Sequence, residues 1–107
     1  DGSSPGNTNQ DGPSPVLPEL FYQNAIGITG IAFCEECSLG QASDGAAFAG
    51  AVNNGEVTRI VFNGQRDAIA DHSVVYNHGG STLSFELGPG GRLFFSDFNG
   101  INKLVRA

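Results

Sequence analysis

The chain of 107 residues contains no methionine, no tryptophan and only five Lys and Arg residues. Eleven Asp and Glu residues give it a formal net charge of −6. Proteins that bind nucleic acid or an anionic membrane surface need clustered basic residues, which this composition does not supply. No apolar run approaches the roughly twenty residues of a membrane helix. The sequence therefore predicts neither a nucleic-acid partner nor a transmembrane segment.

Strong helix formers are also scarce, whereas glycine is abundant, with sixteen residues. From residue 19 onward, apolar and polar residues alternate with a period near two, and turn signals recur about every ten residues. We expect residues 19–107 to form a single all-β domain, a small antiparallel β-sandwich or flattened barrel of about seven to eight short strands. The expected strands are 19–23, 26–33, 46–53, 56–62, 72–77, 81–87, 92–98 and 101–106.

Residues 1–18 hold four of the five prolines and no packed apolar pattern. Such a segment cannot bury enough apolar area to offset its loss of chain entropy, so it is predicted to be flexible or extended. An alternative is an extended arm that completes the sheet of a neighbouring subunit. Its apolar residues would be Val16, Leu17, Leu20, Phe21 and Tyr22.

Three short turns predict hairpins. Asn54-Gly55 separates two alternating runs, and we expect it to form a two-residue turn that leaves both faces of the hairpin half apolar. Gly79-Gly80 is predicted to join 72–78 to 81–87, and Asn99-Gly100 to join the last two strands. Phe94 and Phe95 are adjacent, so they must point to opposite faces, and both are candidate partner-binding residues.

The most distinctive motif is Cys34-Glu35-Glu36-Cys37. Two acidic residues between the thiols disfavour a thiolate and hence redox chemistry, so a structural disulfide between Cys34 and Cys37 is preferred. An alternative zinc set adds His72 and His78 to the two cysteines. By strand parity we expect His72 on the apolar face, where a histidine is more often a hydrogen-bonded core residue.

Catalytic patterns are weak. Asp71-His72-Ser73 contains the residue types of a hydrolase triad, but neighbours on a strand point to opposite faces. A paired-carboxylate site, drawn from Glu56, Asp67, Asp71, Glu86 and Asp97, has little room in so small a domain. The segment Asp97–Asn102 resembles part of a calcium loop without its terminal acid. We therefore predict no enzyme activity, no metal and no cofactor.

The favoured function is an exported, non-catalytic structural or assembly module that self-associates through its N-terminal arm, as a subunit of a fibre or shell. A first alternative is a monomeric extracellular module that recognises carbohydrate or protein through Tyr76–Gly80, Asp97 and Asn99, with an exposed aromatic ring. A second is a small zinc-stapled domain. Because no methionine precedes Asp1, we expect a removed leader and a secreted or cell-surface location, with a lipid anchor on a preceding residue as a variant of that expectation.

Overall fold

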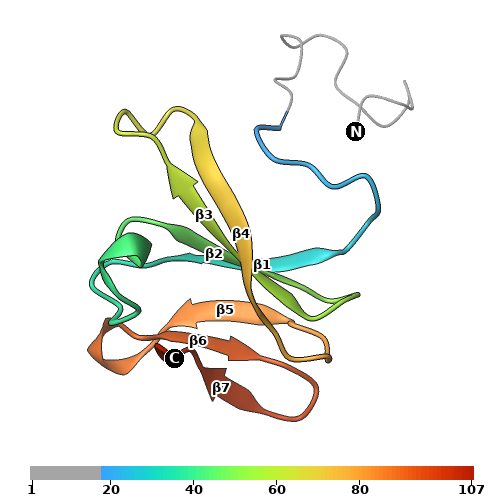
Figure 1. Ribbon diagram of the computed structural model, residues 1–107. Coiled ribbons are helices and arrows are strands. Elements are labelled where there is room, and N and C mark those ends of the chain that lie inside the picture. The colour runs from blue at the N-terminus through green and yellow to red at the C-terminus, as the bar shows by residue number, and fades with distance from the viewer. Residues whose placement is uncertain (1–17) are drawn as a thin grey trace, which may run out of the picture.

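The computed structural model of the protein describes residues 18–107, which form two antiparallel sheets (Figure 1). The first sheet runs in chain order from β1 to β4, and the second from β5 to β7. Their bounds are β1 Ile28–Phe33, β2 Ala47–Ala51, β3 Glu56–Phe62, β4 Ile69–Asn77, β5 Ser84–Leu87, β6 Leu93–Ser96 and β7 Ile101–Lys103. Two short 3-10 turns, Gln41–Ser43 and Pro89–Gly91, lie in the loops. The predicted all-β class is confirmed.

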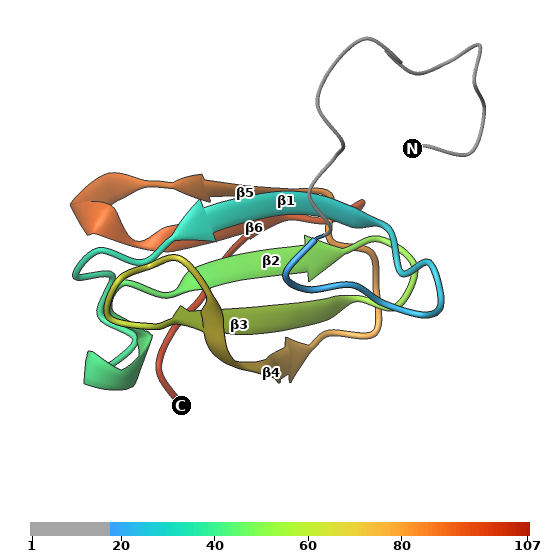
Figure 2. The same cartoon turned by 90° about the horizontal axis from the view of Figure 1, so that it is seen from above.

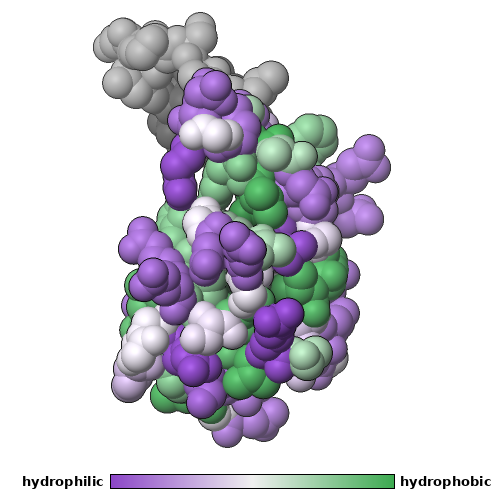
Figure 3. Space-filling view, turned by 60° about the vertical axis from the view of Figure 1, so that its left-hand side comes forward, coloured by the Kyte–Doolittle hydropathy of each residue, from purple (hydrophilic) through white to green (hydrophobic). Residues whose placement is uncertain are grey.

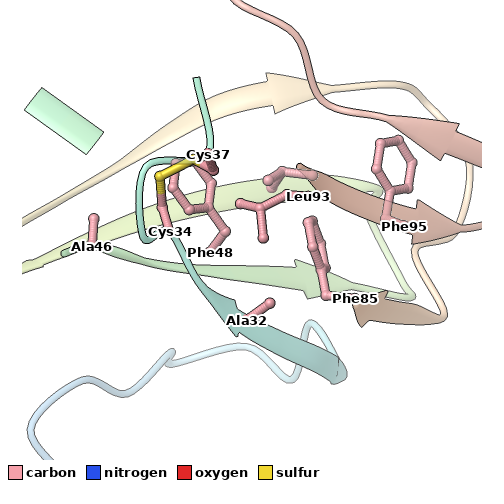
Figure 4. Packing of buried hydrophobic residues seen from close by; sticks show 9 residues of the cluster. Ala32, Cys34, Cys37, Ala46, Phe48, Phe85, Leu93 and Phe95 are labelled. Carbon is pink, nitrogen blue, oxygen red and sulfur yellow. A yellow bond between two sulfur atoms is a disulfide. The ribbon is translucent and has the colours of Figure 1, made fainter. Parts of the chain in front are cut away.

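The sheets lie face to face, with β5 against β1 and β2 (Figure 2). The main core fills the space between them and includes both cysteines (Figure 4). Its buried members are Ala32, Cys34, Cys37, Ala46, Phe48, Val57, Phe85, Leu93 and Phe95. Among residues 18–107, no helix has the length and apolar character needed to cross a membrane.

The sheets approach most closely at a pair of opposed glycines. Gly30 of β1 lies opposite Gly50 of β2 in the strand register. A Cβ atom on Gly30 would lie 2.6 Å from the backbone nitrogen of Phe85, and one on Gly50 would lie 2.2 Å from Cγ2 of Thr82. Both distances are shorter than any real contact, so the second sheet docks where the first carries no side chains.

The β2–β3 hairpin forms as expected but with a longer turn. Residues 52–55 make the turn, and Gly50 lies opposite Val57. The predicted two-residue turn is wrong because the N–H groups of Val52 and Asn53 donate to the carbonyls of Gly27 and Ile26. The pairing register of β2 with β3 differs from the predicted one by two residues, so each side chain keeps its predicted face.

Both faces of this hairpin are apolar, as predicted. Phe48 and Val57 enter the core between the sheets, whereas Ala47, Ala49 and Ile60 form a second buried cluster on the outer face.

The predicted hairpin at Gly79-Gly80 is wrong. Strand β4 pairs with β3, and residues 78–83 cross to the second sheet. The chain reverses instead after β3, where Oδ1 of Asn63 accepts hydrogen bonds from the N–H groups of Asp67 and Ala68. This side-chain closure of a longer turn sets the pairing of β3 with β4.

Residues 19–23 form no strand, contrary to expectation. Leu20 packs against the outer cluster of the first sheet, and the Tyr22 hydroxyl donates to Oγ1 of Thr58 at 3.5 Å. Phe21 is 71% exposed. The other arm residues, Val16 and Leu17, lie outside the described residues.

Candidate functional site: a cleft between the sheets

A cleft of about 770 Å³ opens between the two sheets on the side of β4 and β7. Its walls come from β3, β4 and β7, from the turn at Asp97 and from residues 104–107. Phe48 and Phe95 of the main core reach its floor. On the face shown in Figure 3, exposed apolar residues form several separate patches between polar residues.

His78 occupies the start of the crossover between the sheets. Its Nε2 lies 2.8 Å from Oγ1 of Thr82, and its Nδ1 lies 4.0 Å from Oδ2 of Asp97. The imidazole stacks on the Tyr76 ring with 6.1 Å between centroids and an interplanar angle of 15°. These contacts fix the histidine ring in the cleft, with the half-exposed Tyr76 ring beside it.

Asp97 closes the β6–β7 turn. Its Oδ1 accepts hydrogen bonds from the N–H groups of Asn99, at 2.7 Å, and Gly100, at 2.9 Å, while Oδ2 accepts one from Nδ2 of Asn102. The Asn99 N–H is the largest cause that holds the pKa of Asp97 below its ordinary value, because these bonds favour the charged carboxylate. The calcium-like spacing at Asp97–Asn102 therefore serves a hairpin turn.

Arg59 points from β3 toward the second sheet, on the same face as Phe48 and Val57. Its Nε is buried without a hydrogen-bond partner, and its Nη1 lies 3.5 Å from Oγ of Ser43. Lys103 and Arg106 also line the cleft. Three of the five cationic residues in the chain thus gather at one site.

Cys34 and Cys37 form a disulfide with 5.2 Å between their Cα atoms (Figure 4). Both are fully buried at the end of the main core. This pairing leaves the proposed zinc set without thiolate ligands, and in residues 18–107 no three His, Cys, Asp or Glu side chains gather as metal ligands would.

The expectation for His72 is wrong. Since β4 pairs with β3, His72 lies opposite Ile60 on the outer face of the first sheet and is exposed. Asp71 and Ser73 lie opposite Val61 and Arg59 on the inner face, so the three triad residue types diverge as expected.

The adjacent aromatics Phe94 and Phe95 do point to opposite faces. Phe95 is 4% exposed in the main core, and its ring lies 5.2 Å from that of His78. Phe94 is half-buried on the outer face, where a Cβ atom on Gly88 would lie 2.3 Å from its ring. Phe95 is thus buried and Phe94 half-buried by their own chain, whereas Tyr76 is 48% exposed.

Sequence reasoning placed Tyr76, His78 and Asp97 in one recognition site, and the structure brings these three residues to one cleft. It missed Arg59, Lys103 and Arg106. A signal for Arg59 exists in the sequence, because it interrupts the apolar row that Val57 and Val61 form at alternate positions. Burying a charged group costs free energy, so a charged residue within a core-facing row indicates a candidate functional site.

No family model and no curated protein matches the chain. The fold is similar to part of a solved structure of a "glucose dehydrogenase", with a TM-score of 0.71 and 20% sequence identity. The match covers 86% of this chain but only 29% of that protein, so the chain spans less than a third of its length. At this identity the likeness shows a shared fold.

Proposed function

We propose that the protein is a non-catalytic assembly module that associates with further copies of itself through exposed apolar side chains at the edges of its sheets. The observation that carries this proposal is the exposure of Val74 on β4 and of Phe98 and Ile101 on the β6–β7 hairpin, at 51%, 76% and 78%. Strands β4 and β7 end the two sheets. Apolar side chains beside open sheet edges favour contact with another chain.

The edge of β4 adds a second argument. Edge strands are commonly protected by Lys, Pro, inward-pointing charged residues or bulges. Strand β4 has no Lys or Pro across nine residues, and its inward-pointing charge is Asp71. Two bulges interrupt its pairing with β3 near Val75 and Ala70, but the residues between them are regular. A strand from a second copy can add to this stretch through backbone hydrogen bonds.

One further observation supports the proposal. The Cys34–Cys37 disulfide favours an exported, oxidising location, which suits a fibre or shell subunit. The N-terminal arm, with Val16 and Leu17, is the segment that we propose to extend toward a neighbouring copy.

The test is the double variant Val74→Lys/Phe98→Lys, compared with the parent chain by size-exclusion chromatography with light scattering and by electron microscopy. We expect the parent to form oligomers or polymers and the variant to be monomeric, because two exposed apolar side chains that the interface would bury become charged. The matched control, Gln41→Lys/Gln65→Lys, adds the same charge at two exposed loop positions and should assemble like the parent.

A monodisperse parent monomer at high concentration would overturn the proposal. Equal assembly of parent and Val74→Lys/Phe98→Lys would reject these edges as the interface. Deleting residues 1–17 in a parallel sample tests the arm, since assembly that survives this deletion does not depend on Val16 and Leu17.

A second candidate function is recognition of carbohydrate through the cleft, favoured by the convergence of Tyr76, His78 and Asp97 there. Aromatic rings stack on the apolar faces of sugars, and polar side chains bond their hydroxyls. A screen of the labelled chain on a glycan array tests this candidate, and an array without any bound sugar would reject it.

A further inference from the structure

We propose that the cleft binds a sugar acid, with its carboxylate at Arg59 and its ring against Tyr76. This proposal rests on the second candidate function and names its ligand class. It depends on the cationic residues of the cleft, which the recognition hypothesis from sequence did not include.

The first argument is the unsatisfied state of Arg59. Its Nε is buried without a partner, and within the part of the chain that the structure describes its side chain makes one hydrogen bond, a long one to Ser43. Among residues 18–107, the contact within 4.0 Å between a basic side chain and a carboxylate is that of His78 Nδ1 with Asp97 Oδ2, and no carboxylate lies within that distance of the Arg59 guanidinium. A partly buried guanidinium without a counterion is costly, and a carboxylate bound in the cleft compensates its charge by accepting hydrogen bonds from the Nη atoms.

The second argument is local charge. Arg59, Lys103 and Arg106 line the cleft, and Asp97 is the one acidic side chain in its lining, so the charged side chains of the cleft leave a net charge of +2. Both oxygens of Asp97 already accept hydrogen bonds within their own turn. The chain as a whole carries −6, and the cationic side chains of the cleft lower the repulsion that an anion meets there.

The third argument is the shape of the ligand that fits beside these charges. The Tyr76 residue is 48% exposed, and stacking on His78 fixes the orientation of its ring. Such a ring offers a planar apolar face to the C–H side of a pyranose. A cleft of about 770 Å³ is within the usual range for small-molecule sites. A pyranose that carries a carboxylate uses both the ring and the charge.

The experiment is an NMR titration of the full chain with three probes: glucuronate, glucose and inorganic phosphate. Glucuronate differs from glucose by its carboxylate, and phosphate supplies the charge without a ring. We expect glucuronate to bind about tenfold or more tightly than either of the others, because charge-assisted hydrogen bonds and stacking both contribute. Shifts should concentrate at residues of the cleft.

Two variants locate the carboxylate. Arg59→Gln should weaken glucuronate binding about tenfold or more and bring it close to that of glucose, while Arg59→Lys should recover part of the loss because it keeps the charge without the planar fork. The control is Arg66→Gln, since Arg66 lies over the rings of Phe33 and Phe62, outside the cleft. It should leave binding unchanged.

The outcomes separate the two hypotheses. Equal binding of glucose and glucuronate keeps carbohydrate recognition and overturns the sugar-acid proposal. Phosphate that binds as tightly as glucuronate overturns the role of the ring, and the absence of binding by every probe overturns both. If Arg59→Gln loses its native amide spectrum, Arg59→Lys alone decides the role of the guanidinium.

Discussion

Gly30 and Gly50 decide how closely the two sheets of this protein can approach. They are opposed in β1 and β2, and the backbone of β5 and the side chain of Thr82 occupy the space above them. Glycine is needed here for lack of a side chain, not for an unusual backbone angle. The joint between the sheets therefore depends on two positions that contribute no apolar surface of their own.

We expect Gly50→Ala to lower the free energy of unfolding by about 1–3 kcal/mol, as other overpacked cores do. The added methyl group would lie 2.2 Å from Cγ2 of Thr82 and 2.9 Å from Cε2 of Phe85. Urea unfolding followed by circular dichroism measures the change.

The matched control is Gly64→Ala, where an added Cβ meets nothing within 4 Å. That variant should differ from the parent by less than about 0.5 kcal/mol. Equal stability of the two variants would mean that the sheets can separate at Gly50 without cost.

Single-residue expectations succeeded where they followed from parity alone. The opposite faces of Phe94 and Phe95 and the divergence of Asp71 from His72 need only the alternation of a strand. The error at His72 has a different origin, because its face was assigned through a hairpin with residues 81–87 that does not form. Arg59 was not predicted as a site residue because its position in the cleft depends on Ser43 and the second sheet, which are distant from it in sequence.

Turns of this protein are closed mainly by Asn and Asp side chains. Asn54 accepts a hydrogen bond from the N–H of Glu56, Asn63 from that of Asp67, and Asp97 from those of Asn99 and Gly100. Such side chains replace backbone partners in tight reversals. The hairpins of both sheets thus depend on single polar residues at their turns.

The turn at Asp97 predicts a pH dependence. Its pKa is lowered in the folded protein from an ordinary value of 3.8, so its carboxylate stabilises the fold above that value and loses this effect as the pH falls toward the lowered pKa. Asp97→Asn should therefore be less stable than the parent at about pH 6, and the difference should shrink at about pH 3.

Urea midpoints of parent and variant at the two pH values test this sign. Asp71→Asn, at an exposed carboxylate on β4, is the control and should show no such convergence. A stability difference for Asp97→Asn that grows on acidification would contradict the proposed role of the turn.

Most strands could be predicted, since alternation of apolar and polar residues is a local property. Their partners could not be predicted equally well. Gly79-Gly80 has the composition of a hairpin turn, yet the turn at Asn63 already pairs β4 with β3, and an added Cβ on Gly55 would lie 2.2 Å from the Gly80 carbonyl oxygen. The packing of that loop against Gly55, rather than its composition, determines its path.

At the scale of the whole molecule, each face of the first sheet is covered in part. The second sheet covers one, and Leu20 and Tyr22 lie on the other, against the cluster of Ala47, Ala49 and Ile60. Residues that were expected to reach a neighbouring subunit thus contact their own sheet.

We expect the chain 18–107 to retain the thermal stability of the full chain and the chain 24–107 to melt at least about 5 °C lower. The longer chain keeps Leu20 and Tyr22 on the outer cluster, whereas the shorter one exposes this apolar surface, and a loss of about 1 kcal/mol shifts the melting temperature of a domain of this size by that amount. Differential scanning calorimetry of the three chains makes the comparison. Equal melting of 18–107 and 24–107 would show that this segment adds nothing to stability.

The all-β class was predictable from composition and period, but the cleft was not. It lies between two sheets, and its residues come from positions as far apart as Leu39 and Arg106. Only Tyr76, His78 and Asp97 were placed there from sequence, because turns and exposed aromatics carry local signals. The cationic residues become a site only once the sheets are docked.

The order of the strands also has a consequence for the folding of the chain. Within each sheet, strands that follow one another in sequence pair, so each sheet can form through closure of loops of at most thirteen residues, the longest being residues 34–46. The contacts that join the sheets, such as those of Leu93 with the first sheet's core residues, span longer stretches of chain. Folding rates fall as contacts become more distant in sequence. We therefore expect formation of the contacts at Gly30 and Gly50 to limit the folding rate, so that substitutions at that joint slow refolding in stopped-flow experiments more than those in the turns.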